Sequence, residues 1–273
     1  MPAERGGMDV AETDVTEMDA TEMDTTEDAV LGGRLVLRQP RRGHRVGHDA
    51  ILLAAAVTAH PGDQAVDLGA GVGAAGLVLA RRVEGLSVTL VEIDPALNAL
   101  AAANAARNGL APRVRSICID VTGAAASLTA AGLAAGMATH VLMNPPFNAP
   151  QYNPSPDPAR RLAHMASGET LDRWVAAAAR LLDAAGTLTL IWRADGLGGV
   201  LAALAAAFGA VSVLPVYPKP AAPAIRILVR AVKGSRAPLA ILPGLTLADA
   251  AGTPTPAAEA ILRGGNALAW VEN

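Results

Sequence analysis

The sequence is poor in cysteine, lysine and aromatic residues. Of 273 residues, one is cysteine (Cys118), two are lysines (Lys219 and Lys233) and 3% are aromatic. A single cysteine excludes an intramolecular disulfide and a metal site built from several cysteines, and it suits a reducing compartment. No apolar run approaches the roughly 18 to 20 residues of a membrane helix, and the N-terminus lacks a basic region followed by an apolar one. We therefore expect a soluble, cytoplasmic protein with no membrane contact.

Acidic residues are concentrated at the N-terminus. Residues 1–28 hold ten acids and one base, which leaves 15 acids and 21 bases, a net charge of +6, for residues 29–273. The acidic segment contains the near-repeat TEMDA, TEMDT, TED and no aromatic residue, so we expect 1–28 to be a disordered acidic tail. The basic remainder is typical of a protein that binds a polyanion, and a solvated surface of scattered arginines is the alternative.

Five arginines precede the regular part of the chain, in a stretch without any acid: Arg34, Arg38, Arg41, Arg42 and Arg45. They surround a short apolar alternation, which predicts a strand, a turn and a basic rim. A helix should then run from Ala50 to about Ala59, and Asp49 could simply be its N-cap.

From residue 65 onward, apolar runs of four to six residues alternate with alanine-rich stretches. This pattern predicts a parallel sheet with helices between its strands. The expected strands are 65–68, 88–91, 114–119, 140–143 and 187–192, with 211–216 and 225–232 closing the sheet as its antiparallel edge. The expected helices are 74–82, 96–108, 127–134, 171–182 and 199–208.

We assign residues 29–273 to one α/β domain. Its parts are an N-terminal hairpin and helix at 29–59, a core at 60–233 and a C-terminal extension at 234–273.

A glycine-rich turn follows the first strand of this core. Gly71, Gly73 and Gly76 satisfy the spacing of a dinucleotide-binding turn, and Glu92 lies 21 residues after Gly71, near the roughly 20 expected for a ribose contact. Alone, this pattern would indicate an NAD-dependent oxidoreductase. Asp67 changes the balance, because its carboxylate would repel a pyrophosphate and suits a ligand that carries an amino group.

Polar residues end four successive strands of the expected sheet: Asp67, Glu92, Asp120 and Asn144. They are separated by 25, 28 and 24 residues, each about one strand–helix unit. Because parallel strands end at the same edge, the four side chains should converge there. The alternative for each acid taken singly is helix capping, since all three precede helices.

These features resemble the class I S-adenosylmethionine-dependent methyltransferases over roughly residues 60–233. The resemblance implies a Rossmann-like, seven-stranded, mostly parallel sheet with an antiparallel edge strand and helices on both faces. It also implies S-adenosylmethionine as the cofactor. The implied cofactor-binding residues are Asp49, Asp67, Gly69, Ala70, Gly71, Gly73, Glu92, Ile93, Asp120, Val121 and Asn144.

The same resemblance implies a role for each strand end. The loop 69–73 would pass the methionine part of the cofactor, with Asp67 near its amino group. Glu92 would accept hydrogen bonds from both ribose hydroxyls, since one carboxylate can accept two donors. Ile93 would pack on the adenine, while Asp120 and the backbone of Val121 would read its edge.

The next residues, Asn144-Pro145-Pro146-Phe147, resemble the catalytic motif of methyltransferases that modify a planar, conjugated amine. In those families the Asn side-chain oxygen and the first Pro carbonyl accept hydrogen bonds from the amine protons, which turns the lone pair toward the methyl group. Proline stiffens this loop, Phe147 would stack on a flipped base, and no general base is strictly required. The alternative is an ordinary Pro-Pro turn with a core phenylalanine.

The flanks resemble bacterial methyltransferases that modify adenine N6 in valine tRNA, so the likeness extends over about residues 30–265. This resemblance implies an RNA substrate, a segment with Asp49 over the cofactor, and the five arginines on RNA phosphates. Pro254 and Asn148 stand where related sequences have aromatics. The alternatives are a protein glutamine-N5 methyltransferase, an rRNA guanine-N2 methyltransferase, a catalytically silent RNA-binding relative and the NAD-dependent oxidoreductase. The histidines lack metal-ligand spacing, so we expect no metal.

Overall fold

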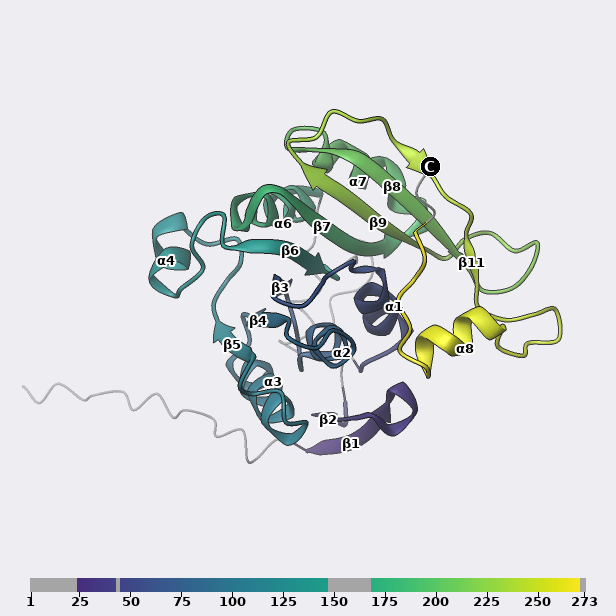
Figure 1. Cartoon of the computed structure of the whole chain (residues 1–273), viewed down its shortest axis with the longest axis horizontal. Helices are drawn as coiled ribbons and strands as arrows, with labels where there is room; N and C mark the ends of the chain where they lie inside the picture. Colours follow the sequence, from purple (N-terminus) through teal and green to yellow (C-terminus); the bar gives the residue numbers. More distant parts are fainter. Residues whose placement is uncertain (1–23, 43–44, 147–167, 271–273) are drawn as a thin grey trace, which may run out of the picture.

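A mixed sheet runs through the centre of the computed structural model, which describes residues 24–42, 45–146 and 168–270 (Figure 1). Within these residues the sheet has nine strands in the order β10-β8-β9-β7-β6-β3-β4-β5, and β11 also pairs with β8. The seven long strands are β3 (Gln64–Leu68), β4 (Ser87–Glu92), β5 (Val114–Cys118), β6 (Ala138–Met143), β7 (Leu182–Arg193), β8 (Phe208–Tyr217) and β9 (Arg226–Lys233). The two short strands are β10 (Ala240–Ile241) and β11 (Leu245–Thr246).

The direction of the strands largely follows the expectation from the sequence. Strands β3 to β7 pair in parallel, as an alternation of apolar runs and helices predicts. The antiparallel strand, β9, lies between β7 and β8 and not at the edge where we expect it, because β8 and the short strand β10 lie outside it. The chain leaves β7, starts β8 two positions away and then turns back, so β9 fills the gap. The short strands β10 and β11, which were not predicted, pair in parallel with β8.

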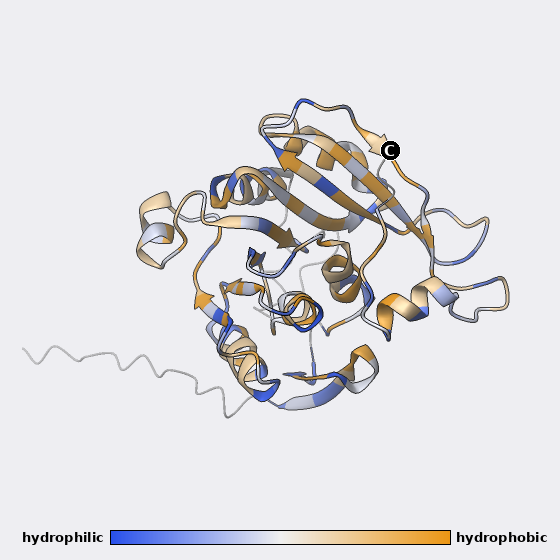
Figure 2. Cartoon of the chain, in the orientation of Figure 1, coloured by the Kyte–Doolittle hydropathy of each residue, from blue (hydrophilic) through white to orange (hydrophobic). Residues whose placement is uncertain are grey.

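Helices cover both faces of the sheet. They are α1 (His48–Ala56), α2 (Ala74–Arg82), α3 (Pro95–Arg107), α4 (Ala125–Ala130), α6 (Gly168–Leu181), α7 (Leu197–Leu204) and α8 (Pro256–Leu262). One hydrophobic core contains buried residues of α1, α2, α3 and α8, and a second contains those of α4, α6 and α7. The strands between them are predominantly apolar (Figure 2). The Rossmann-like arrangement inferred from the sequence is confirmed.

Local signals in the sequence account for two of the helix starts. The side chain of Asp94 accepts hydrogen bonds from the backbone of Ala96 and Leu97 at the start of α3, and Pro95 occupies the first helical position. Thr255 caps α8 in the same way, with Pro256 in the first position. An N-cap oxygen and a following proline both favour a helix start, because the first backbone N–H groups have no partner within the helix.

The N-terminal strand corrects one prediction. Strand β1 (Thr25–Val30) pairs antiparallel with β2 (Leu35–Pro40), joined by the short helix η1 (Leu31–Gly33). Residues 24–28 are therefore ordered, contrary to the disordered tail expected for 1–28, and residues 1–23 lie outside the described part. Leu35 and Leu37 of β2 are buried in the first core, which fixes the face of β2 that points inward and so the register in which β1 pairs with it.

The C-terminal segment is part of the same domain. The indole N–H of Trp270 donates to the Ala56 carbonyl at 2.7 Å, and the Leu268 amide donates to the Ala55 carbonyl at 2.8 Å. Both carbonyls belong to the last turn of α1, where no intrahelical donor is available. The guanidinium of Arg230 lies 4.7 Å from the Trp270 ring centre. Within the described ranges, no helix is both long and apolar enough to cross a membrane.

Gly76 in α2 provides a test of this packing. A Cβ there would clash with Leu90 Cδ2 and lie 3.1 Å from Asp67 Oδ2, so Gly76→Ala should lower the free energy of unfolding by about 1–3 kcal/mol. The control is Gly198→Ala in α7, where a Cβ meets no atom within 4 Å and stability should stay within about 1 kcal/mol. Urea unfolding of both variants checks this, and equal stabilities would contradict the close approach of α2 to β4.

Candidate active site

The structure brings the four polar strand ends to one edge of the sheet. Strand β3 lies between β4 and β6, and β5 lies beside β4. Leu68 pairs with both Val91 and Met143, and Glu92 pairs with Cys118. The residues that follow these positions therefore lie side by side at the carboxyl ends of parallel strands, where open α/β sheets bind ligands.

The glycine-rich turn takes a conformation that requires glycine. Gly69, Gly71 and Gly73 have φ of +67°, +56° and +87°, in the left-handed region. A Cβ on Gly69 would clash with the Trp174 ring, and one on Gly73 would lie 2.9 Å from Leu90 Cδ1. At Gly71 a Cβ would meet nothing within 4 Å, so the backbone there borders open space and a ligand can approach it.

Glu92 anchors this turn. Its Oε2 accepts a hydrogen bond from Gly71 N at 2.7 Å, and its Oε1 accepts from Ile93 N and Asp94 N at 2.9 and 3.0 Å. The Ala70 amide donates to the Val91 carbonyl at 2.9 Å, beside the carboxylate. A carboxylate offers about four acceptor directions, so these bonds fix its position and leave about one direction for a ligand.

The positions expected around an adenine differ in what they present. Ile93 is 46% exposed, which is unusual for a large apolar side chain and suits contact with a planar ring. The Val121 side chain is buried in the second core, so only the backbone of this residue is left to contact a ligand. Asp120 is exposed, and its Oδ1 accepts hydrogen bonds from the amide and the hydroxyl of Thr122, each at 2.8 Å.

Asp67 holds the start of α2. The carboxylate is 2% exposed, and its Oδ2 accepts a hydrogen bond from Gly76 N, in the first turn of α2, at 2.8 Å. Gly73, the N-cap residue, has no side chain to do this. Asp67 therefore does cap α2, although it lies in β3 and not at the N-cap position. The contact of Asp67 with a ligand amino group stays a prediction. Burial, assisted by the Glu92 charge and opposed by the Gly76 bond, raises the pKa of Asp67 to about 7.

Asn144 presents a buried acceptor without a donor. Its Oδ1 is enclosed and, among the residues that the structure describes, accepts no hydrogen bond. Pro145 beside it is buried and Pro146 is half-buried, while Phe147, the last residue of the expected catalytic motif, lies outside the described residues. An unpaired buried carbonyl oxygen costs free energy, so this atom is a candidate to accept a donor from a ligand.

Asp49 has a different local role from the one we considered. The N-cap of α1 is Gly47, and Asp49 lies within the first turn. Its Oδ2 pairs with Arg226 Nε at 2.8 Å, at the start of β9, with both side chains roughly a quarter exposed. This ion pair fixes Asp49 toward the sheet, and its contact with a cofactor stays a prediction.

The five N-terminal arginines do not form one uniform surface. Arg34 is a structural clamp, since its guanidinium donates to the carbonyls of Leu31, Arg263 and Gly264. Three ion pairs join other arginines to acids at the N-terminal end of the hairpin: Arg41–Asp24 at 2.9 Å, Arg45–Asp28 at 2.7 Å and Arg107–Glu27 at 2.8 Å. Arg38 Nε donates to Thr25 Oγ1 at 2.7 Å, and Arg42 is exposed.

Two residues at this edge were not predicted from the sequence. Trp174 of α6 packs against Gly69 beside the end of β6, and Asn104 of α3 donates to the Val72 carbonyl of the turn at 3.0 Å. The signal for Asn104 was its spacing from Asn108, because residues four apart share one helix face. Trp174 carries no local pattern that would place it against a loop about a hundred residues earlier in the chain.

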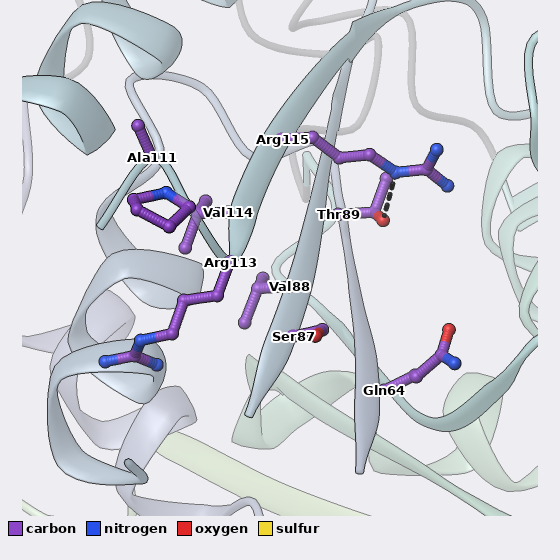
Figure 3. Close-up of a pocket in the computed structure, with 9 residues that line it drawn as sticks. Gln64, Ser87, Val88, Thr89, Ala111, Arg113, Val114 and Arg115 are labelled. Carbon is purple, nitrogen blue, oxygen red and sulfur yellow. Dashed lines mark hydrogen bonds between the residues drawn. The ribbon is translucent and has the colours of Figure 1, made fainter. Parts of the chain in front are cut away.

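A groove of about 390 Å³ lies at the opposite edge, where β3, β4 and β5 begin (Figure 3). Its two arginines are engaged with the protein. Arg115 Nε donates to Thr89 Oγ1 at 3.0 Å, and Arg113 donates to the carbonyls of Val83 and Leu86. Among the described residues, no three His, Cys, Asp or Glu side chains gather as metal ligands.

The raised pKa of Asp67 predicts a pH-dependent stability. Because its folded-state pKa of about 7 exceeds the ordinary 3.8, the folded protein holds this proton more tightly, and the contribution to stability is lost as pH rises toward 7. Asp67→Asn removes the ionisation, so its stability relative to wild type should increase by about 2 kcal/mol between pH 5 and pH 8. Urea unfolding at both pH values measures this, and parallel pH profiles would contradict the assignment.

Comparisons with known proteins agree with this geometry. The model of the family described as "Methyltransferase small domain" matches residues 44–217. A predicted O-methyltransferase of known structure, protein Atu636 from Agrobacterium tumefaciens, is 30% identical with a TM-score of 0.70, covering 82% of this chain and 99% of that one. A transferase from Pyrococcus horikoshii, protein PH0793, is 11% identical with a TM-score of 0.51 over 78% of this chain and 73% of its own, which shows the fold alone.

Among curated proteins, the chain is 35% identical over 105 residues to the tRNA1(Val) (adenine(37)-N6)-methyltransferase of Shewanella amazonensis. The match covers 38% of this chain and 42% of that relative, so it spans less than half of either protein. The family model covers more than half of the chain, and its match includes the glycine-rich turn and the four strand ends. The chain therefore belongs to the methyltransferase small domain family, and it is an S-adenosylmethionine-dependent methyltransferase.

Proposed function

We propose that this enzyme methylates the exocyclic N6 of an adenine in structured RNA, with tRNA as the substrate class. The observation that carries the proposal is the buried Asn144 Oδ1, which accepts no hydrogen bond within the described structure. An exocyclic amine carries two N–H donors, and so it can satisfy this oxygen and a second acceptor beside it. The N6 chemistry of the Shewanella amazonensis relative, as its name gives it, supports the same choice.

The residues at the carboxyl edge fit the cofactor. Open space borders Gly71, Ile93 exposes an apolar surface, and Glu92 has a fixed carboxylate with an acceptor direction left. We assign the turn to the amino acid part, Glu92 to the ribose and Ile93 to the adenine. When bound, S-adenosylmethionine supplies a methyl group on a sulfonium, which is electrophilic without further activation.

Catalysis by this chain would then consist mainly of orientation. Asn144 Oδ1 and the Pro145 carbonyl would accept hydrogen bonds from the two N6 N–H groups, so that the nitrogen lone pair, otherwise delocalised into the ring, turns toward the methyl group. The N6 nitrogen would gain the methyl group as the sulfur–methyl bond breaks, with S-adenosylhomocysteine as the leaving group. It would then release one proton to solvent, because a neutral amide is a poor base. Stacking of the flipped base on Phe147 stays a prediction.

The basic surface favours RNA over a protein substrate. Arg41, Arg45 and Arg107 are exposed or half-exposed, and each is paired with an acid of the segment 24–28. Exposed ion pairs are worth only about 0–1 kcal/mol each, so RNA phosphates can replace these carboxylates at small cost. Arg34, committed to backbone carbonyls, is left out of the proposed RNA surface.

The direct experiment is methyl transfer from labelled S-adenosylmethionine to tRNA that lacks the modification, followed by nucleoside analysis. The proposal predicts label in N6-methyladenosine. Label in N2-methylguanosine, or in a protein glutamine when protein is offered instead, would replace it with one of the other conjugated nitrogen acceptors.

Asn144→Ala should lower kcat by on the order of 10²-fold, because the acceptor that orients the amine is lost. The affinity for S-adenosylhomocysteine should change by less than about threefold, since we assign the Asn144 bond to the acceptor base and not to the cofactor, the other role that the resemblance implies. Steady-state kinetics and calorimetric titration measure the two quantities. An unchanged kcat would remove Asn144 from the mechanism.

The arginine surface predicts opposite changes in tRNA affinity for two double variants. Arg41→Gln with Arg45→Gln should weaken tRNA binding and reduce the slope of log affinity against log salt by about 2. Asp24→Asn with Asp28→Asn should strengthen binding at low salt, because these acids occupy the same guanidinium groups. Arg115→Gln, at the opposite edge, is the control and should leave binding unchanged. Filter binding at two salt concentrations decides, and equal effects of the two double variants would contradict the surface.

A further inference from the structure

Helix α3 holds strand β2 through two asparagines one turn apart. Asn108 Oδ1 accepts from Val36 N at 3.0 Å, and its Nδ2 donates to the Val36 carbonyl at 2.9 Å. Asn104 makes the same pair of bonds with Arg38, at 2.8 and 2.9 Å. Alternate residues of a strand direct their backbone groups to the same side, so the edge of β2 that β1 leaves unpaired is satisfied by side-chain amides.

The two asparagines differ in their third bond. Asn108 Nδ2 donates back to its own helix, to the Asn104 carbonyl at 2.8 Å. Asn104 Nδ2 donates instead to the Val72 carbonyl, in the glycine-rich turn, at 3.0 Å. Asn104 is 0% exposed, so water does not compete for these bonds. One buried side chain therefore joins the arginine-bearing hairpin to the turn.

The bond to Val72 fixes a peptide group that the turn needs. The Val72 carbonyl accepts from Asn104, and the amide of the same peptide, Gly73 N, donates to the Ala70 carbonyl at 2.8 Å. Gly71 N is held by Glu92, so the peptide groups 70–71 and 72–73 of the turn are both fixed by hydrogen bonds. Because glycine permits many backbone conformations, these bonds select one of them.

We propose that Asn104 is a positioning residue that holds the glycine-rich turn in its cofactor-binding shape and couples it to the hairpin. The coupling half rests on the proposed function, in which Arg41 and Arg45, just after β2 of the hairpin, contact RNA. Cofactor and RNA then strengthen each other's binding, because each orders a segment that Asn104 ties to the other. Only an amide supplies one acceptor and two donors here: Asp lacks both donors, and Leu lacks all three groups.

The test compares Asn104→Leu with Asn108→Leu, with S-adenosylhomocysteine as the probe in calorimetric titrations. Both variants lose the two bonds to β2, and only Asn104→Leu loses the bond to the turn. Asn104→Leu should weaken S-adenosylhomocysteine binding about tenfold, and Asn108→Leu should change it less than about threefold. Unfolding midpoints should fall in both variants, so the difference in S-adenosylhomocysteine affinity separates a positioning role from simple loss of stability.

The second arm repeats the titrations with saturating tRNA. In wild type and Asn108→Leu, tRNA should tighten S-adenosylhomocysteine binding about fivefold or more, and in Asn104→Leu this factor should fall to about one. If Asn104→Leu does not fold, Asn104→Ala replaces it, since a small cavity is tolerated where a branched side chain is not.

The outcomes distinguish the two proposals. Equal losses of S-adenosylhomocysteine affinity in the two variants, or none in Asn104→Leu, would overturn the positioning role. Failure of wild type to bind tRNA would overturn the RNA substrate and the coupling together, while the first arm still decides what Asn104 does to the turn.

Discussion

The site depends on one tight turn between β3 and α2. Gly69, Gly71 and Gly73 all take left-handed backbone conformations there, and the space that side chains would fill is taken by Trp174 and Leu90 or left open. Such a turn has little tendency to hold itself. Two polar side chains from other elements fix it, Glu92 from β4 and Asn104 from α3, and Asp67 of β3 holds the first turn of the helix α2 that follows. The elements that carry these side chains must be in place before the turn has a defined shape.

The polar strand ends differ in how much acceptor capacity the fold leaves for a ligand. Asp67 accepts a hydrogen bond from Gly76 N of α2, and Glu92 accepts three hydrogen bonds from backbone amides. Asn144 Oδ1 has none of its capacity used within the described residues. Asp67 and Glu92 therefore serve mainly to hold the protein backbone. The acceptor with no hydrogen bond, Asn144 Oδ1, lies at the position assigned to the reacting amine.

The sequence predicts the regular part of the fold well because period and composition are local. Helix α2 matches its expected bounds, 74–82, and the five parallel strands lie where the apolar runs predict. The acidic composition of Thr25–Val30 concealed β1, whose order comes from its pairing with β2. The two-residue strands β10 and β11 are too short for any periodicity, and the place of β9 depends on a connection that returns across the sheet.

The candidate site was predictable as a set of positions rather than as a set of contacts. Parallel topology alone places Glu92 and Asn144 at one edge. Three contacts were not predictable. Asp67 bonds to the first turn of α2, Arg34 bonds to the carbonyls that follow α8, and Trp174 packs on Gly69, which lies about a hundred residues earlier in the chain. No local pattern encodes such contacts, and they decide which of the predicted residues remain available to a ligand.

The central claim is that Asn144 Oδ1 accepts a hydrogen bond from the amine to be methylated. The most direct measurement is a crystal structure of the enzyme with S-adenosylhomocysteine and an RNA stem-loop of the substrate. The account predicts an adenine N6 about 3 Å from Asn144 Oδ1, with the Pro145 carbonyl as its second acceptor. A base held with its N6 bonded elsewhere, or an Asn144 Oδ1 that accepts from a protein group in the complex, would contradict it.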